Sequence, residues 1–138
     1  MIAQAEGGES GLVFSSGMAA ILQSIIAYVG KGDHIVSSPV LYGGVYNYLK
    51  NEATRFGVET TFADFTDMAA VEAAIKPNTK ILYTETITNP LMEVFDLEEI
   101  AKIAHKHGCK LIVDNTFASP AVCKPLALGA DIVADSST

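Results

Sequence analysis

Short apolar runs recur along the chain, and longer segments in which apolar residues return at helical spacing separate them. The runs are mostly continuous rather than alternating, which is typical of β-strands that are covered on both faces, as in parallel sheets. They predict strands at residues 11–15, 34–38, 58–63, 80–85, 109–114 and 131–135.

The segments between these runs predict helices at residues 17–29, 43–56, 67–76 and 96–107. The last is the clearest, because Asp96 and Glu99 have the spacing of a capping box and Gly108 follows the final turn. The first is apolar nearly all round, which predicts that it is buried. Strands that alternate with helices predict an α/β fold with a mainly parallel, doubly wound sheet, and no linker or repeat divides the chain.

Composition and charge narrow the classes of function. Apolar residues make up 49% of the sequence and charged residues 18%, which indicates a soluble globular protein. The net charge of −7 repels phosphate backbones and anionic lipids, and no apolar stretch is long enough to span a bilayer, so we expect neither a nucleic-acid nor a membrane partner. Cys109 and Cys123 have no metal-ligand spacing, which predicts free thiols, no metal site and a cytoplasmic location.

The residues after each predicted strand are the candidates for a binding site, because ligands of parallel α/β sheets bind beyond the carboxyl ends of the strands. Gly17 and Met18 open the first long helix, and their backbone N–H groups form a candidate phosphate seat, although Ser-Ser-Gly is also an ordinary helix cap. Ser136 and Thr138 lie two residues apart after the last strand, so both hydroxyls could donate to one phosphate. The absence of a Walker loop and of G-x-G-x-x-G argues against ATP, GTP and NAD.

Three further side chains at strand ends carry candidate chemistry. Tyr42 lies beside two glycines, where its ring could lie against a flat ligand, and a core tyrosine is the equal alternative. The amide of Asn89, before a proline, could reach a ligand, although a turn-forming asparagine is the simpler explanation when the residue is taken alone. Asp114 ends a buried strand, where a carboxylate is costly unless it meets a cation, a metal or several donors; a helix cap is the structural alternative.

Five segments, in matching order and at similar spacing, resemble the Cys/Met metabolism family of enzymes that depend on pyridoxal 5′-phosphate (PLP). The segments are residues 14–20, 41–44, 85–90, 113–120 and 128–138 without 134–135. The family includes cystathionine γ-lyase, γ-synthase and β-lyase, methionine γ-lyase and O-acetylhomoserine sulfhydrylase. The resemblance implies the large domain of PLP fold type I, the aspartate aminotransferase-like fold. It also implies elimination or replacement at Cβ or Cγ of sulfur amino acids or activated homoserine.

The resemblance assigns a role in PLP binding to each strand-end candidate. The backbone of Gly17 and Met18 and the hydroxyls of Ser136 and Thr138 would hold the phosphate. The other candidates would contact the ring.

Tyr42 would stack on the ring and act near the leaving group, Asp114 would keep the ring nitrogen protonated, and Asn89 would bond the phenolic oxygen. Tyr42 and Asp114 are therefore the expected catalytic residues. Two positions depart from the family. Gly44 stands where many methionine γ-lyases have cysteine, which argues modestly against that activity, and Asp135 stands where relatives often have histidine. A carboxylate at position 135 would be unfavourable near a phosphate unless it points away.

In the family a lysine that binds the cofactor covalently follows the Ser-x-Thr pair at once, and no lysine of this sequence occupies that place. We therefore expect residues 1–138 to be a single partial domain, the central part of the PLP-binding large domain, and the parent to be a homodimer or homotetramer. Whether the chain is itself an enzyme stays open, because the alternative is a catalytically inactive fragment without stable PLP attachment. A receiver-like signalling domain with Asp114 as phosphoacceptor would need acidic residues on the first predicted strand, which has none.

Overall fold

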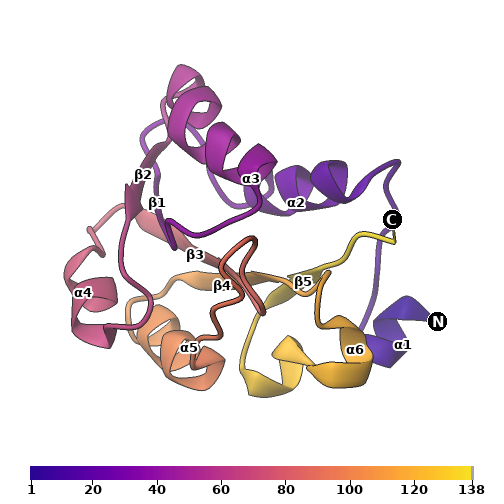
Figure 1. Cartoon of the computed structure of the whole chain (residues 1–138). Coiled ribbons are helices and arrows are strands. Elements are labelled where there is room, and N and C mark those ends of the chain that lie inside the picture. Colours follow the sequence, from indigo (N-terminus) through magenta and orange to yellow (C-terminus); the bar gives the residue numbers. More distant parts are fainter. Residues whose placement is uncertain (138) are drawn as a thin grey trace.

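The computed structural model describes residues 1–137, and its centre is a five-stranded sheet in which all neighbouring strands are parallel (Figure 1). The order across the sheet is β2-β1-β3-β4-β5. The strands are β1 (His34–Ser37), β2 (Glu59–Phe62), β3 (Thr79–Glu85), β4 (Lys110–Asp114) and β5 (Ile132–Ala134). This is the parallel α/β sheet that the apolar runs predict.

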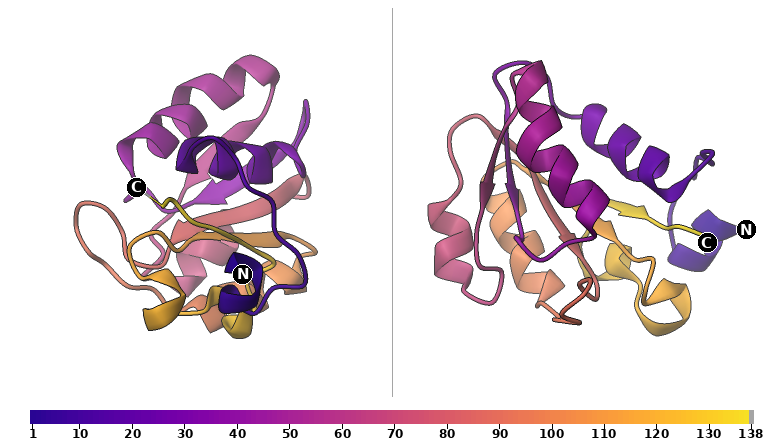
Figure 2. Two further views of the ribbon diagram at one scale, coloured as in Figure 1. Left: turned by 90° about the vertical axis from the view of Figure 1, so that its right-hand side faces the viewer. Right: turned by 45° about the horizontal axis from the view of Figure 1, so that its top comes forward.

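Helices cover both faces of the sheet (Figure 2). One face carries α2 (Gly17–Ile26) and α3 (Gly43–Asn47), which continues through a π-helical turn, η1 (Tyr48–Glu52), and a 3-10 turn, η2 (Ala53–Phe56). The opposite face carries α4 (Met68–Ala73) and α5 (Leu97–Lys106). Short helices complete the described chain: α1 (Ile2–Glu6), α6 (Ser119–Val122) and η3 (Pro125–Leu128).

Side chains of the three central strands alternate between two apolar cores, one on each face. The core beneath α4 and α5 includes Val36, Leu82 and Leu111, and the core beneath α2 and α3 includes Ile35, Ile81 and Ile112. All six are completely buried. Burial on both faces explains why these strands read as continuous apolar runs rather than as alternating ones.

The helix signals in the sequence correspond to real caps. The Asp96 carboxylate accepts a hydrogen bond from the Glu99 N–H at 3.1 Å, and Gly108 lies just past α5 with a φ of 70°, in the left-handed region that favours glycine. Helix α4 is capped by Asp67, whose carboxylate accepts from the N–H groups of Ala69 and Ala70. The predictions for these two helices are therefore confirmed.

Two expectations are wrong. Residues 11–15 form no strand; Leu12 and Val13 are 84% and 89% exposed, because no neighbouring strand pairs with this segment. Helix α2 is not buried all round either, since Ile21 and Ile25 face the sheet while Ile26 is half exposed. Within residues 1–137, no helix is long and apolar enough to cross a membrane.

Candidate functional site

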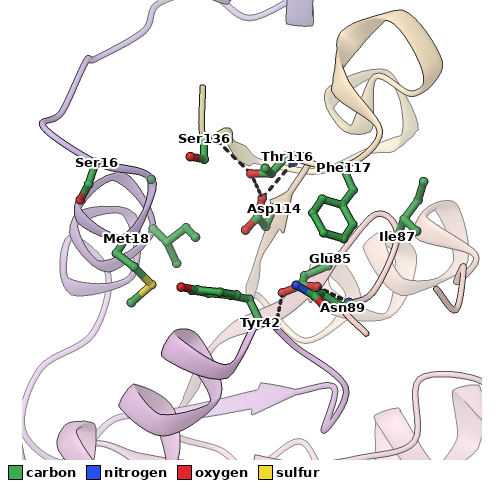
Figure 3. A pocket seen from close by; sticks show the side chains of 12 residues that line it. Ser16, Met18, Tyr42, Glu85, Ile87, Asn89, Asp114, Thr116, Phe117 and Ser136 are labelled. Atoms are coloured by element: carbon green, nitrogen blue, oxygen red, sulfur yellow. Dashed lines mark hydrogen bonds between the residues drawn. The ribbon is translucent and has the colours of Figure 1, made fainter. Parts of the chain in front are cut away.

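A cavity of about 360 Å³ opens at the carboxyl edge of the sheet, where the chain leaves β1, β3, β4 and β5. It lies where the direction of the chain across the sheet reverses. Strand β2 is added on one side of β1, and the next strand, β3, is added on the other side. Ligand crevices form at such switch points, because the loops that leave the two neighbouring strands diverge to opposite faces of the sheet. The cavity is lined by Ser16, Gly17, Met18, Ile21, Tyr42, Glu85, Ile87, Asn89, Asp114, Thr116, Phe117 and Ser136 (Figure 3).

One wall of the cavity is the N-terminus of α2. The Ser16 hydroxyl caps the helix by accepting from the Ala19 N–H at 3.1 Å, while the N–H groups of Gly17 and Met18 precede the first amide that the helix can satisfy internally. A Cβ atom on Gly17 would lie 2.5 Å from the Ser136 Cβ and 2.8 Å from its Oγ. Glycine therefore allows the start of α2 to approach the segment after β5, and the two segments together form a candidate anion seat.

A second wall is the ring of Tyr42, which is 48% exposed and lines the cavity (Figure 3). The alternative of a core tyrosine is therefore wrong. A Cβ on Gly44 would lie 2.8 Å from the Tyr42 Cε1 and 3.1 Å from the Met18 Sδ. The absence of a side chain at position 44 thus leaves the space into which the Tyr42 ring fits.

The floor of the cavity holds the carboxylate of Asp114, only 8% exposed at the end of β4. Its Oδ1 accepts from the Thr116 N–H at 2.9 Å and from the Thr116 hydroxyl at 2.6 Å, while Oδ2 takes part in neither bond. Exposed Asp64 accepts the same pair of bonds from Thr66 and has a lowered pKa. Burial outweighs these bonds at Asp114 and raises its pKa, so the ionised form needs a further partner.

A second carboxylate, Glu85 at the end of β3, lines the same cavity and is 4% exposed. It accepts the backbone N–H groups of Tyr42 at 2.6 Å and of Asn89 at 2.9 Å. Burial raises the pKa of Glu85 to about 7 against these two bonds, and the charge of Asp114 adds to the rise. No basic side chain lines the cavity in the part of the chain that the structure describes.

The structure brings together six of the seven residues that the sequence singles out. Gly17, Met18, Tyr42, Asn89, Asp114 and Ser136 all line this cavity. Thr138 lies outside the described residues. Glu85 and Thr116 also line the cavity, although neither is among the residues predicted from the sequence. Glu85, like Asp114, is a carboxylate at the end of a buried strand, so the same signal indicates it.

Asp135 does not line the cavity. Its carboxyl group interacts electrostatically with Glu6 of α1, which is 2% exposed and whose Oε1 accepts from the Asn115 side-chain amide at 3.0 Å. Burial, followed by the charges of Glu6 and Asp114, raises the pKa of Asp135 to about 6. The buried Oε2 of Glu6 has no donor among the described residues.

This acid pair gives the folded chain a pH-dependent stability. Because the folded pKa of Asp135 exceeds its ordinary value of 3.8, the folded state binds more protons between about pH 4 and pH 6, and stability falls as pH rises through that window. We expect Asp135→Asn to reduce this slope and to raise the free energy of unfolding at pH 7 by about 1–2 kcal/mol, a value discounted for partial solvent screening. Urea denaturation at pH 5 and pH 7.5 measures both effects. The exposed Glu9→Gln is the control, and equal slopes in Asp135→Asn and in the unaltered chain would contradict the pairing.

Fold and site together define a class. A parallel α/β sheet whose carboxyl edge carries a free helix N-terminus, an aromatic wall and a buried carboxylate is typical of small-molecule binding domains, and these features would complement a flat ligand with a positive ring and a negative tail. Comparison with known proteins identifies the class more closely. A family model described as "Cys/Met metabolism PLP-dependent enzyme" matches residues 1–138.

Relatives agree with the family model. The chain is 50% identical over 137 residues to the cystathionine γ-synthase/O-acetylhomoserine (thiol)-lyase of Bacillus subtilis, covering 99% of this chain and 36% of the relative. It is 47% identical over 138 residues to the L-methionine γ-lyase of Porphyromonas gingivalis, covering 99% of this chain and 35% of the relative. The chain therefore spans about a third of the length of the curated relatives it matches.

A solved structure agrees as well. The cystathionine γ-lyase of Lactobacillus plantarum, complexed with L-serine, superposes with a TM-score of 0.94 at 47% identity, covering 97% of this chain and 35% of that one. The chain belongs to the Cys/Met metabolism PLP-dependent enzyme family, and its fold is that of the PLP-dependent enzymes of fold type I.

Proposed function

We propose that this chain supplies the cofactor-binding core of an enzyme that eliminates or replaces a group at Cβ or Cγ of sulfur amino acids or activated homoserine. The observation that carries the proposal is the donor set of one cavity. Asp114 is a buried carboxylate whose pKa is raised, and the same cavity holds an anion seat and an aromatic ring but no basic lining residue in residues 1–137. A ligand with a protonated ring nitrogen and a phosphate complements all three features.

The residues fit PLP at each of its groups. The N–H groups of Gly17 and Met18 would bind the phosphate. The Ser136 segment can lie close to them because Gly17 has no Cβ. We also assign Thr138 to the phosphate, from its place in the family motif. Bound PLP supplies an electron-withdrawing ring that accepts the electron pair left when a substrate Cα–H bond breaks.

The side chains around the ring would orient it and hold its charge. The Asp114 carboxylate would keep a proton on the ring nitrogen, and the Thr116 bonds to Oδ1 would fix its orientation while Oδ2 faces the ligand. Tyr42, which lines the cavity, would cover one ring face and exclude water, and its hydroxyl would pass a proton to a leaving group. The Asn89 amide would donate to the phenolic oxygen.

Ligand titration tests the binding part of the proposal. We expect the chain to bind PLP about tenfold or more tightly than pyridoxal, which lacks the phosphate, because charge-assisted bonds at a helix N-terminus separate the two ligands. Isothermal titration calorimetry measures both affinities, with inorganic phosphate as a competitor. Equal affinities for PLP and pyridoxal would remove the anion seat from the proposal.

Activity is tested in a chimera in which this chain replaces the matched third of the Bacillus subtilis relative, to which it is 50% identical. The substrates are cystathionine, methionine and O-acetylhomoserine with a thiol, which the names of the relatives indicate. Release of a 2-oxo acid or formation of a thioether supports the proposed chemistry. A folded chimera that binds PLP without turning over any of the three would favour the alternative, a catalytically inactive chain.

A further inference from the structure

We infer that Glu85 is a positioning residue, whose two carboxylate oxygens hold the backbone of Tyr42 and the backbone of Asn89 in place at the cavity. The inference rests on the proposed function, because it concerns the two residues that would contact the cofactor ring. Glu85 Oε1 accepts from the Tyr42 N–H at 2.6 Å and Oε2 accepts from the Asn89 N–H at 2.9 Å. Figure 3 shows both bonds leaving the same carboxylate toward two different loops.

Each of these two N–H groups depends on Glu85 for its partner. Tyr42 is the residue before α3, so its N–H precedes the helix that begins at Gly43 and has no carbonyl partner within it. Asn89 lies in the loop between β3 and α5, and its N–H bonds to the Glu85 side chain rather than to a neighbouring strand. The loop after β1 and the loop after β3 therefore share one anchor, at the end of a central strand.

The geometry requires two acceptor oxygens. A carboxylate offers an acceptor at both positions, whereas the glutamine amide offers one acceptor and one NH₂ donor. A glutamine at position 85 would thus satisfy one N–H and present its own donor to the other. Since the carboxylate is 4% exposed and makes no ion pair within the described chain, its retention in so costly a position is explained by this double acceptance.

We call the two bonds from the Tyr42 and Asn89 N–H groups to the Glu85 carboxylate the clamp, and the clamp responds to pH. The ionisable groups that face Glu85 are Asp114 on β4 and Tyr83 on its own strand, and neither is cationic. Burial raises the pKa of Glu85 to about 7. Below that pH, one of its oxygens carries a proton and becomes a donor, so one of the two loops loses its acceptor.

Backbone NMR of the full chain tests the clamp without any ligand. We expect the amide proton shifts of Tyr42 and Asn89 to change together with one midpoint near pH 7, and Glu85→Gln to abolish this common titration. The exposed Glu59→Gln is the matched control and should leave it intact. Two amides that titrate independently, or not at all, in the unaltered chain would overturn the inference whatever the variants do.

The positioning role is tested by PLP titration of the same samples. Glu85→Gln should weaken PLP binding by about tenfold, the effect of one misplaced partner, and should remove the loss of affinity that the unaltered chain undergoes below pH 7. The pH dependence of PLP affinity in Glu85→Gln serves as the correction for the ionisation of PLP itself. If the unaltered chain binds PLP and Glu85→Gln binds it equally well at every pH, the positioning role fails alone. If the unaltered chain does not bind PLP, the proposed function fails, and the joint amide titration still decides the clamp.

Discussion

Replacement of Asp114 by asparagine is expected to lower turnover of the chimera by roughly 10²- to 10⁴-fold. Asparagine keeps an acceptor oxygen for Thr116, so the change removes the charge and preserves the local hydrogen bonds. Loss of one partner from a buried ion pair costs about 3–5 kcal/mol, and each 1.4 kcal/mol is a factor of ten in rate. Steady-state kinetics of the chimera, with PLP at saturating concentration, measures the loss.

Asp64→Asn is the matched control for this experiment. Asp64 accepts from the Thr66 N–H at 2.8 Å and from its hydroxyl at 2.6 Å, in the same arrangement as Asp114 and Thr116, but it is exposed and outside the cavity. Turnover of Asp64→Asn should be unchanged within a factor of about two. Equal turnover in Asp114→Asn and the parent chimera would remove Asp114 from the cofactor assignment.

The second large effect is expected from Gly17→Ala. A Cβ at this position would lie 2.5 Å from the Ser136 Cβ, an atom too close to the backbone to move cheaply, so the start of α2 must shift away from Ser136. We expect PLP affinity to fall by about 10- to 100-fold through the loss of charge-assisted bonds to the phosphate, and pyridoxal affinity to stay nearly constant. Calorimetry of both ligands separates the phosphate contribution from the rest.

Gly43→Ala is the control for that change. Gly43 is also the first residue of a helix, α3, but a Cβ there meets nothing within 4 Å, so the substitution tests the cost of alanine without the clash. Its affinity for PLP should match that of the unaltered chain. A parallel loss of PLP and pyridoxal binding in Gly17→Ala would indicate general damage to α2 instead of a local effect on the anion seat.

The central strands and the long helices could be predicted because the pattern of apolar and polar residues indicates which of their faces are buried. The strand predicted at residues 11–15 is absent, and the apolar character of Leu12 and Val13 does not reveal that no strand lies beside them. A strand needs a hydrogen-bonding neighbour, and periodicity carries no information about neighbours. The short helix α1 has too few residues for its period to be recognised.

The residues of the candidate site also differ in how far the sequence predicts them. Asp114 could be predicted, because a carboxylate at the end of an apolar strand is unusual in itself. The role of Glu85 could not, because it depends on two loops that return to the same strand end from positions 42 and 89. Likewise, no sequence pattern indicates that Glu6 reaches Asp135 across 129 positions (135 − 6).

The close approach of Gly17 to Ser136 also bears on how the chain reaches its native state. The two sides of the candidate anion seat come from α2, which precedes β1, and from the segment after β5, so the seat forms only after the crossovers from β1 to β5 have closed. Such long-range closure is slow, because the entropy of each loop is lost before its contacts form. A phosphate ligand at one hundred times its Kd that binds only the folded chain would stabilise it by about 2.7 kcal/mol against forms in which the seat is absent. The bound cofactor would then stabilise the folded chain. A higher cofactor concentration during synthesis would protect more of the chain from proteolysis.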